Sequence, residues 1–270
     1  MISVPEKSSQ PPSSENFSEL QGIRFRYKIA GTGDQVILLH GWGGSVKSLE
    51  SVFQRLILFH EVFAIDLPGH GMSDLPPNPW GVFEYSEFLR NVMDKFNLIK
   101  PHFIAHSFGG RVAIHLAANF PQRVNKLILV NSAGVKPHRS TRYYFKVSLA
   151  KVAKYFGKRF GRVGRVVRNR LYLAIQSKDY SNAGPLRDTF IKIVNEDLAP
   201  ILPRIESPTL LIWGENDKDT PLSSGRLMQK LIPKSELLIL KDAGHFSYVD
   251  QFGKFCLFSE KFLRENVSYP

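Results

Sequence analysis

A serine among small residues is the first feature of this sequence that could carry out chemistry. Ser107 stands in the segment Ala105-His106-Ser107-Phe108-Gly109-Gly110, between an apolar run and a segment rich in small residues. A nucleophile at a strand–turn–helix junction needs a strained backbone and small neighbours, because the strand and the helix approach closely there. The N-terminus of the helix would also direct N–H groups at a developing negative charge. The pattern is A-x-S-x-G, so Ala105 stands where the strict motif has glycine.

Two later segments offer the other groups that a serine nucleophile needs. His245 lies in the loop-like segment Asp242-Ala243-Gly244-His245-Phe246, which follows an apolar run. An imidazole in such a loop could act as a general base. Asp217 and Asp219 follow another apolar run, and we favour Asp217 as the carboxylate that orients the histidine. In the alternative interpretation, both acids only form a turn or cap a helix.

The segment His40-Gly41-Trp42-Gly43-Gly44 would let the backbone approach a substrate closely. We predict that the backbone N–H groups of Trp42 and Phe108 form an oxyanion hole, which needs donors about 2.7–3.1 Å from the developing charge. Taken alone, this segment would be an ordinary glycine-rich turn. Arg111 lies one helical turn after Ser107 and could face a substrate carboxylate, but we favour pairing with an acid beside the sheet. The predicted substrate-binding residues are His40, His106, Arg111 and Phe246.

Short apolar runs alternate with amphipathic segments along most of the chain. This alternation implies a parallel sheet with helices on both faces, which is a doubly wound α/β fold. Each chemical segment described above directly follows one of the apolar runs. A strand paired on one side is predicted at 22–30, buried strands at 35–40, 60–67, 102–107, 126–132, 208–214 and 236–241, and helical segments at 46–59, 82–96, 108–120 and 250–264.

The order of these residues along the chain is Ser107, Asp217, His245, which is nucleophile, acid, base. With these segments and the turn at 66–73, the chain resembles the α/β-hydrolase superfamily from about Gly22 to Arg264. The resemblance implies the α/β-hydrolase fold, a mostly parallel sheet with a helical cap inserted. We therefore expect residues 1–18 to be a disordered tail, 19–133 and 201–270 to form the core, and 134–200 to form a basic helical cap.

The resemblance further implies a serine hydrolase that acts on a carboxylic ester or a related small acyl substrate through an acyl-enzyme. Ser107 argues against the dehalogenase and epoxide-hydrolase branches, whose nucleophile is an aspartate. One alternative is a carbon–carbon bond hydrolase of the meta-cleavage type, although those enzymes usually carry a tryptophan where this chain has Phe246. A second is a lyase of the menaquinone-pathway type, suggested by Arg111. A third, of another class, is a ligand sensor with little turnover.

One segment holds the whole basic excess of the chain. The net charge is +12, from 36 Lys and Arg against 24 Asp and Glu, and residues 135–192 alone hold fifteen basic residues and two acids. A uniformly basic nucleic-acid binder would not be expected to show this distribution, and no recognition motif accompanies the charge, so we predict no nucleic-acid partner. The segment either presents a solvated cationic face, which we favour, or makes peripheral contact with an anionic membrane.

Neither a metal nor a cofactor is predicted, because the sequence has no clustered metal-ligand spacing and no Rossmann or P-loop glycine pattern. The single cysteine, Cys256, excludes an intrachain disulfide. No apolar run approaches 18 residues, and the first residues lack the apolar core of a secretory signal. The expected compartment is therefore the cytoplasm. We make no prediction of the oligomeric state.

Overall fold

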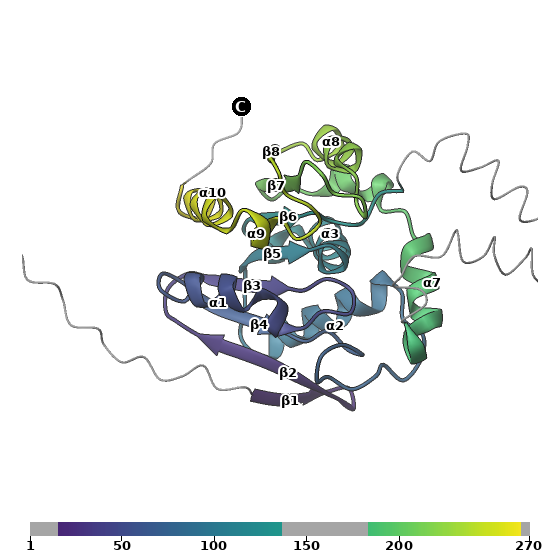
Figure 1. Cartoon of the computed structure of the whole chain (residues 1–270). Coiled ribbons are helices and arrows are strands. Elements are labelled where there is room, and N and C mark those ends of the chain that lie inside the picture. Colours follow the sequence, from purple (N-terminus) through teal and green to yellow (C-terminus); the bar gives the residue numbers. More distant parts are fainter. Residues whose placement is uncertain (1–15, 137–182, 266–270) are drawn as a thin grey trace, which may run out of the picture.

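An eight-stranded sheet forms the centre of the protein, in a computed structural model that describes residues 16–136 and 183–265 (Figure 1). The strand order is β1-β2-β4-β3-β5-β6-β7-β8. The β1–β2 and β2–β4 pairs are antiparallel and all others are parallel, which confirms the predicted doubly wound fold. The strands are β1 (Asn16–Leu20), β2 (Ile23–Ala30), β3 (Gln35–Leu39), β4 (Glu61–Ile65), β5 (His102–His106), β6 (Leu127–Val130), β7 (Thr209–Gly214) and β8 (Ser235–Leu240).

Helices cover both faces of this sheet (Figure 1). One face packs against α2 (Val82–Lys95), α3 (Phe108–Asn119) and α8 (Leu222–Leu231). The other packs against α1 (Glu50–Leu56), α9 (Ser247–Asp250) and α10 (Phe252–Arg264). Short 3-10 helices precede α1 and follow α3, at η1 (Val46–Leu49) and η2 (Pro121–Arg123). None of the described helices is long and apolar enough to cross a bilayer.

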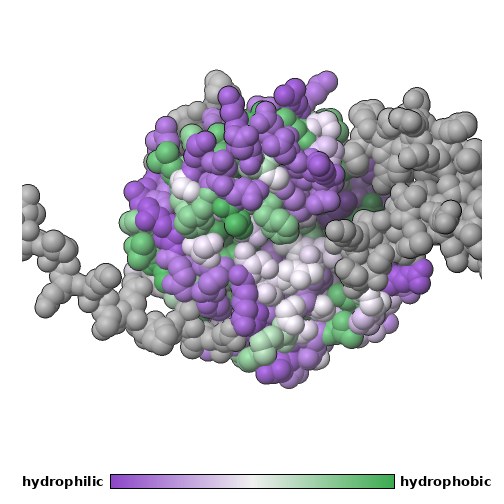
Figure 2. Space-filling view, in the orientation of Figure 1, coloured by the Kyte–Doolittle hydropathy of each residue, from purple (hydrophilic) through white to green (hydrophobic). Residues whose placement is uncertain are grey.

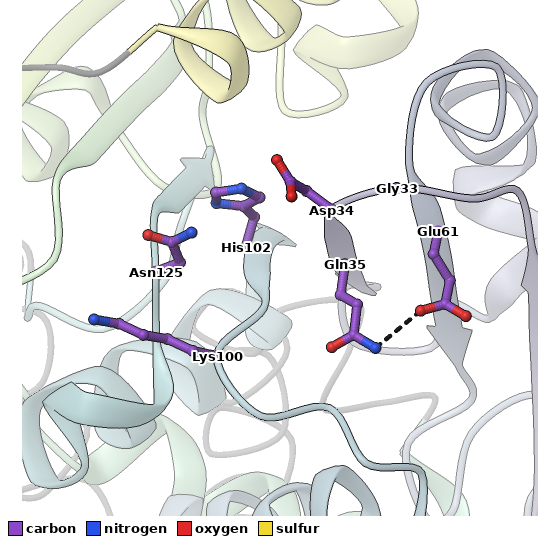
Figure 3. Close-up of a pocket in the computed structure, with 7 residues that line it drawn as sticks. All are labelled: Gly33, Asp34, Gln35, Glu61, Lys100, His102 and Asn125. Carbon is purple, nitrogen blue, oxygen red and sulfur yellow. Dashed lines mark hydrogen bonds between the residues drawn. The ribbon is translucent and has the colours of Figure 1, made fainter.

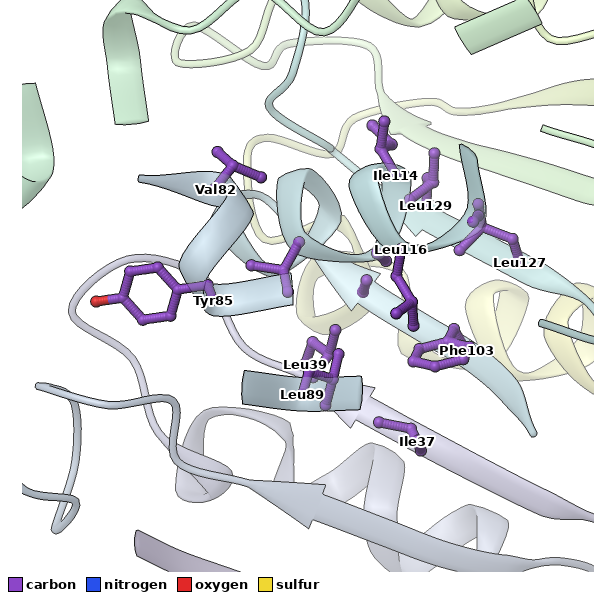
Figure 4. Packing of buried hydrophobic residues seen from close by; sticks show 14 of the residues in the cluster. Ile37, Leu39, Val82, Tyr85, Leu89, Phe103, Ile114, Leu116, Leu127 and Leu129 are labelled. Atoms are coloured by element: carbon purple, nitrogen blue, oxygen red, sulfur yellow. The ribbon is translucent and has the colours of Figure 1, made fainter. Parts of the chain in front are cut away.

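Two apolar cores lie between these helices and the sheet. Successive residues of a strand point to opposite faces, so Ile37 and Leu39 of β3 join one core while Val36 and Leu38 join the other. Figure 4 shows part of the first core, where Phe103 and the β6 residues Leu127 and Leu129 lie beside side chains of α2 and α3. Fully burying a side chain of this kind stabilises the fold by about 1.5–3 kcal/mol. The apolar runs therefore form strands buried on both faces, as predicted.

Two predictions about the N-terminal region are wrong. The predicted tail extends to residue 18, but Asn16–Leu20 form β1. The strand at 22–30 was expected to pair on one side, but β2 lies between β1 and β4. Both differences come from β1, which pairs with β2 and so covers the edge that β2 would otherwise expose. Residues 1–15 lie outside the described residues.

Most of the predicted cap, residues 137–182, also lies outside the described residues. Its returning part contains η3 (Gly184–Leu186) and α7 (Arg187–Asn195), and the chain then enters η4 (Ala199–Arg204). The ring of Phe190 lies 5.0 Å from that of Trp42. A Cβ atom added at Gly69 would lie 2.7 Å from the Leu186 side chain. This returning part therefore packs on the loops that follow β3 and β4.

Candidate active site

Ser107 occupies the sharp turn between β5 and α3, with φ 50° and ψ −109°. A positive φ is uncommon for a residue other than glycine, and such strain is often found at functional sites. A Cβ atom at Gly109 would lie 2.7 Å from the backbone oxygen of His40, and one at Gly110 would lie 2.0 Å from Ser132 Oγ. The turn therefore has the strained backbone and close packing that the small residues predict.

The structure brings together the three residues predicted to form a triad. Nε2 of His245 lies 3.1 Å from Oγ of Ser107, and Nδ1 lies 3.0 Å from Oδ2 of Asp217. Three separate loops supply these side chains, those after β5, β7 and β8. Parallel strands end at the same edge of the sheet, which is why residues 28 and 138 positions from His245 meet there. This arrangement can pass a proton from the hydroxyl to the imidazole.

The carboxylate of Asp217 accepts hydrogen bonds on both oxygens. Oδ1 accepts from the backbone N–H groups of Asp219 and Thr220, at 2.9 and 3.0 Å. Oδ2 accepts from His245, from the Thr220 hydroxyl at 2.6 Å and from the Asn131 amide at 2.5 Å. Burial opposes ionisation, but the hydrogen bonds from His245 and Thr220 outweigh it and lower the pKa of Asp217. The carboxylate that contacts His245 is therefore that of Asp217. Asp219 donates its backbone N–H to the Asp217 carboxylate.

The two amides predicted as an oxyanion hole, the backbone N–H groups of Trp42 and Phe108, have no hydrogen-bond acceptor among residues 16–136 and 183–265. Phe108 is the first residue of α3, so its N–H has no acceptor inside the helix. The rings of Trp42 and Phe108 lie 5.4 Å apart, which holds the two loops together.

Three of the four predicted substrate-binding side chains have partners within the protein. Nδ1 of His40 lies 2.7 Å from the Gly41 oxygen and Nε2 accepts from the Leu67 N–H, so both nitrogens of this buried ring have partners within the protein, and its substrate contact stays a prediction. Nε2 of His106, also buried, bonds to the His245 oxygen. Phe246 differs, because it is 53% exposed and its ring lies 5.5 Å from His245, beside the triad.

Arg111 contacts the segment that follows α7. Its Nη1 donates to the backbone oxygen of Glu196 at 2.9 Å, and burial lowers its pKa to about 10. The favoured expectation was a pair with an acid beside the sheet. The partner is an acidic residue, but the contact is to its backbone carbonyl, and the Glu196 carboxylate accepts from the Val82 N–H. The substrate role of Arg111, on which the lyase alternative depended, thus gains no support.

Residues that could hold a metal also meet at the triad. Asp217, Asp219 and His245 bring their ligand atoms within 4.8 Å of one another. A cation there would compete with the hydrogen bond between His245 and Asp217.

Apolar side chains are exposed near the triad. Figure 2 shows a hydrophobic area on the face that carries α9, and Phe246 and Val249 are exposed apolar residues of this part of the chain.

A polar pocket lies at the other ends of the parallel strands (Figure 3). It has a volume of about 320 Å³ and a polar lining. His102 is the first residue of β5 and His106 the last, so this pocket and the triad lie at opposite edges of the sheet. We assign it no part in the reaction. Its lining residues are Gly33, Asp34, Gln35, Glu61, Lys100, His102 and Asn125.

Sequence reasoning missed Asn131, Thr220 and Ser247, which surround the acid and the loop of the base. Each is a single polar residue that belongs to no motif. The available signal was position, since Asn131 directly follows the buried strand β6 and is itself fully buried. A buried polar side chain at such a strand end needs a partner.

Comparison with known proteins agrees with this architecture. The chain belongs to the alpha/beta hydrolase fold family, whose sequence pattern matches residues 34–252. It is therefore a hydrolase of that family. An uncharacterised protein of Mycobacterium tuberculosis is 26% identical over 287 residues, covering 96% of this chain and 83% of the relative.

Two further matches concern proteins with stated activities. A 2-hydroxy-6-oxononadienedioate/2-hydroxy-6-oxononatrienedioate hydrolase of Escherichia coli is 26% identical over 266 residues, covering 87% of this chain and 90% of the relative. The crystal structure of a bacterial membrane phospholipase A superposes with a TM-score of 0.74 at 25% identity. That match covers 93% of this chain and 86% of the other.

Proposed function

We propose that the protein is a serine hydrolase that cleaves a carboxylic ester of a small molecule through a Ser107–His245–Asp217 triad. The observation that carries this proposal is the 3.1 Å contact between Ser107 Oγ and His245 Nε2, with Nδ1 of the same ring on Asp217. A nucleophile, a base and a group that orients the base are the three parts that acyl transfer to a serine requires.

The reaction proceeds in two half-reactions. His245 Nε2 takes the hydroxyl proton while Ser107 Oγ attacks the ester carbonyl carbon, and the N–H groups of Trp42 and Phe108 bind the resulting oxyanion. The intermediate collapses to an acyl-enzyme, and the leaving alcohol takes the proton from His245. A water molecule then attacks the acyl carbon, giving its proton to His245, and Ser107 regains that proton as the acid leaves. Asp217 stays ionised throughout and stabilises the imidazolium.

A second candidate is hydrolysis of a carbon–carbon bond with the same three residues. The specific support is the Escherichia coli relative, whose name states a hydrolase of 2-hydroxy-6-oxo dienedioates and which matches over 87% of this chain. Phe246 argues against it, because members of the meta-cleavage type usually carry a tryptophan after the catalytic histidine.

A chain-length series of p-nitrophenyl esters, from acetate to palmitate, tests the proposal. We expect turnover with a preferred acyl length, and a loss of about 10⁴-fold or more in kcat for Ser107→Ala, because triad residues act as a unit. Most of the activity surviving in Ser107→Ala would refute the proposal. No ester turnover, together with cleavage of a 2-hydroxy-6-oxo dienoate, would favour the carbon–carbon hydrolase.

We also propose that the basic segment, residues 135–192, brings the protein to an anionic membrane surface. Fifteen Lys or Arg against two acids in residues 135–192 would attract an anionic surface, and the likeness to a membrane phospholipase A suggests adding phospholipids to the substrate series. Co-sedimentation with anionic and neutral vesicles tests this contact. Equal binding to both kinds of vesicle would leave the solvated cationic face as the interpretation.

A further inference from the structure

Asn131 links the loop of the acid to the loop of the base. It directly follows β6 with φ 45°, it is fully buried, and its Nδ2 lies 2.5 Å from Oδ2 of Asp217 and 3.3 Å from the backbone oxygen of Gly244. Its Oδ1 accepts a hydrogen bond from the Ser247 hydroxyl. Asparagine tolerates a positive φ better than most residues, which suits this position.

The contacts of the Asn131 amide allow only one orientation. Its two N–H groups face two acceptors, the Asp217 carboxylate and the Gly244 carbonyl, and its oxygen faces a hydroxyl donor. Turning the amide over would place its oxygen against both acceptors and leave the hydroxyl without an acceptor on the amide. Ser247, at the start of α9, therefore fixes the amide, and the amide directs a donor at the acid.

We propose that Asn131 is a positioning residue that holds Asp217 ionised and correctly placed against His245, with Ser247 locking its orientation. The inference rests on the proposed function, since it assumes that Ser107 is activated through His245. The Asn131 N–H donates to Oδ2 of Asp217, the same oxygen that accepts from His245 Nδ1. Without this N–H, the ionised form of Asp217 is less stabilised and Oδ2 is held less firmly in place. Hydrogen bonds to buried charged groups are strong enough that losing one should slow the reaction about 10- to 100-fold.

Labelling of Ser107 by a fluorophosphonate tests this inference without any knowledge of the substrate. The serine oxygen displaces fluoride from phosphorus, so the second-order rate constant reports how well the serine is activated. The variants are Asn131→Ala, which removes the donor, and Ser247→Ala, which frees the amide. Asn131→Asp keeps the shape and donates to Asp217 only while its own carboxyl is protonated.

The matched control is Asn125→Asp, because Asn125 is an exposed asparagine near the opposite end of the same strand. We expect slower labelling by about 10- to 100-fold in Asn131→Ala and a smaller loss in Ser247→Ala. In Asn131→Asp the rate relative to wild type should fall from about pH 6 to about pH 9, as two carboxylates come to face each other. The control should keep the wild-type profile.

The outcomes separate this inference from the proposed function. Absence of labelling at Ser107 in the wild type would refute both. Labelling of Asn131→Ala within about twofold of wild type, or an Asn131→Asp profile parallel to wild type, would overturn the positioning role while the serine hydrolase stands. Melting temperatures measured at each pH ensure that only folded protein is compared, and Ser247→Ala tests the role if Asn131→Ala does not fold.

Discussion

His106 donates a hydrogen bond from Nε2 to the backbone oxygen of His245 over 2.9 Å. The residue before the nucleophile thus holds the loop of the base, and the two rings lie 4.8 Å apart. Burial, together with the neighbouring His245, lowers the pKa of His106 to about 3. His106 is therefore a neutral donor under ordinary conditions, and its task is to place His245.

Buried neutral histidines should make the fold sensitive to acid. Burial lowers the pKa of His102 to about 4 and that of His70 to about 3, below the ordinary value of 6.5. The unfolded chain binds these protons at higher pH than the folded chain does, so their contribution to stability is complete above about pH 6.5 and decreases as the pH falls toward about 4. The loss approaches about 1.4 kcal/mol per pH unit for each histidine.

His102→Leu tests whether a buried neutral histidine makes the fold sensitive to acid. Nδ1 of His102 is buried without a partner among the described residues and lies far from the triad. We expect the variant to gain melting temperature relative to wild type at about pH 5 and to gain less at about pH 8. Melting curves at both values are the measurement. The same change at both would show that titration of this ring does not matter to stability.

Asp217 and Asp219 form a matched pair for testing the acid. Only Asp217 meets His245 with its carboxylate, so Asp217→Asn should lower kcat by about 10⁴-fold through loss of the correct tautomer. Asp219 contributes its backbone N–H, which Asp219→Asn keeps, so this variant should stay within a few-fold of wild type. Steady-state kinetics on the best ester would decide, and equal losses in the two variants would contradict the assignment.

Gly110 should not tolerate even one added methyl group. A Cβ atom there would lie 2.0 Å from Ser132 Oγ, so Gly110→Ala should destabilise the fold by about 1–3 kcal/mol and disturb the turn at Ser107. The control is Gly253→Ala in α10, where a Cβ atom meets nothing within 4 Å and a gain of about 0.5–1 kcal/mol is expected. Denaturant unfolding measures both. A Gly110→Ala variant as stable as wild type would mean that Ser132 can move aside.

The ion pair of Arg26 and Asp66 should matter to stability far more than surface pairs do. Their side chains are 2% and 0% exposed, and Asp66 also accepts from the backbone N–H groups of Val46 and Met72. Asp66→Ala removes the buried carboxylate that lies 2.8 Å from the Arg26 guanidinium and should cost about 3–5 kcal/mol. Lys261→Ala breaks the exposed pair with Glu265 and should cost less than about 1 kcal/mol. Similar losses in urea titrations would show that burial of the first pair adds nothing.

Much of the fold could be predicted because the apolar runs are local signals. A run such as 35–40 can be buried on both faces only in a covered sheet, and the intervening helical segments imply parallel connections. The strand β1 could not be predicted in this way. Its sequence, NFSEL, is short and largely polar, and it is ordered by antiparallel pairing with β2.

The triad could be predicted by type and order, but its geometry could not. The choice of Asp217 over Asp219 depended on where a turn directs two carboxylates only two residues apart. Asn131 carried no motif, and its side-chain partners Asp217 and Ser247 lie 86 and 116 positions away. His40 had the sequence setting of a substrate-binding residue, yet both of its ring nitrogens serve the backbone.

The sequence by itself determined the class of fold, the strained serine turn and the order of the three reacting groups, because each is encoded in neighbouring residues. The tertiary structure alone decided which acid meets His245, which histidines are structural, and how Asn131 joins two loops. These depend on distances between segments that are remote in the chain. Strand pairing sets those distances, since parallel strands bring the loops after β5, β6, β7 and β8 to one edge of the sheet.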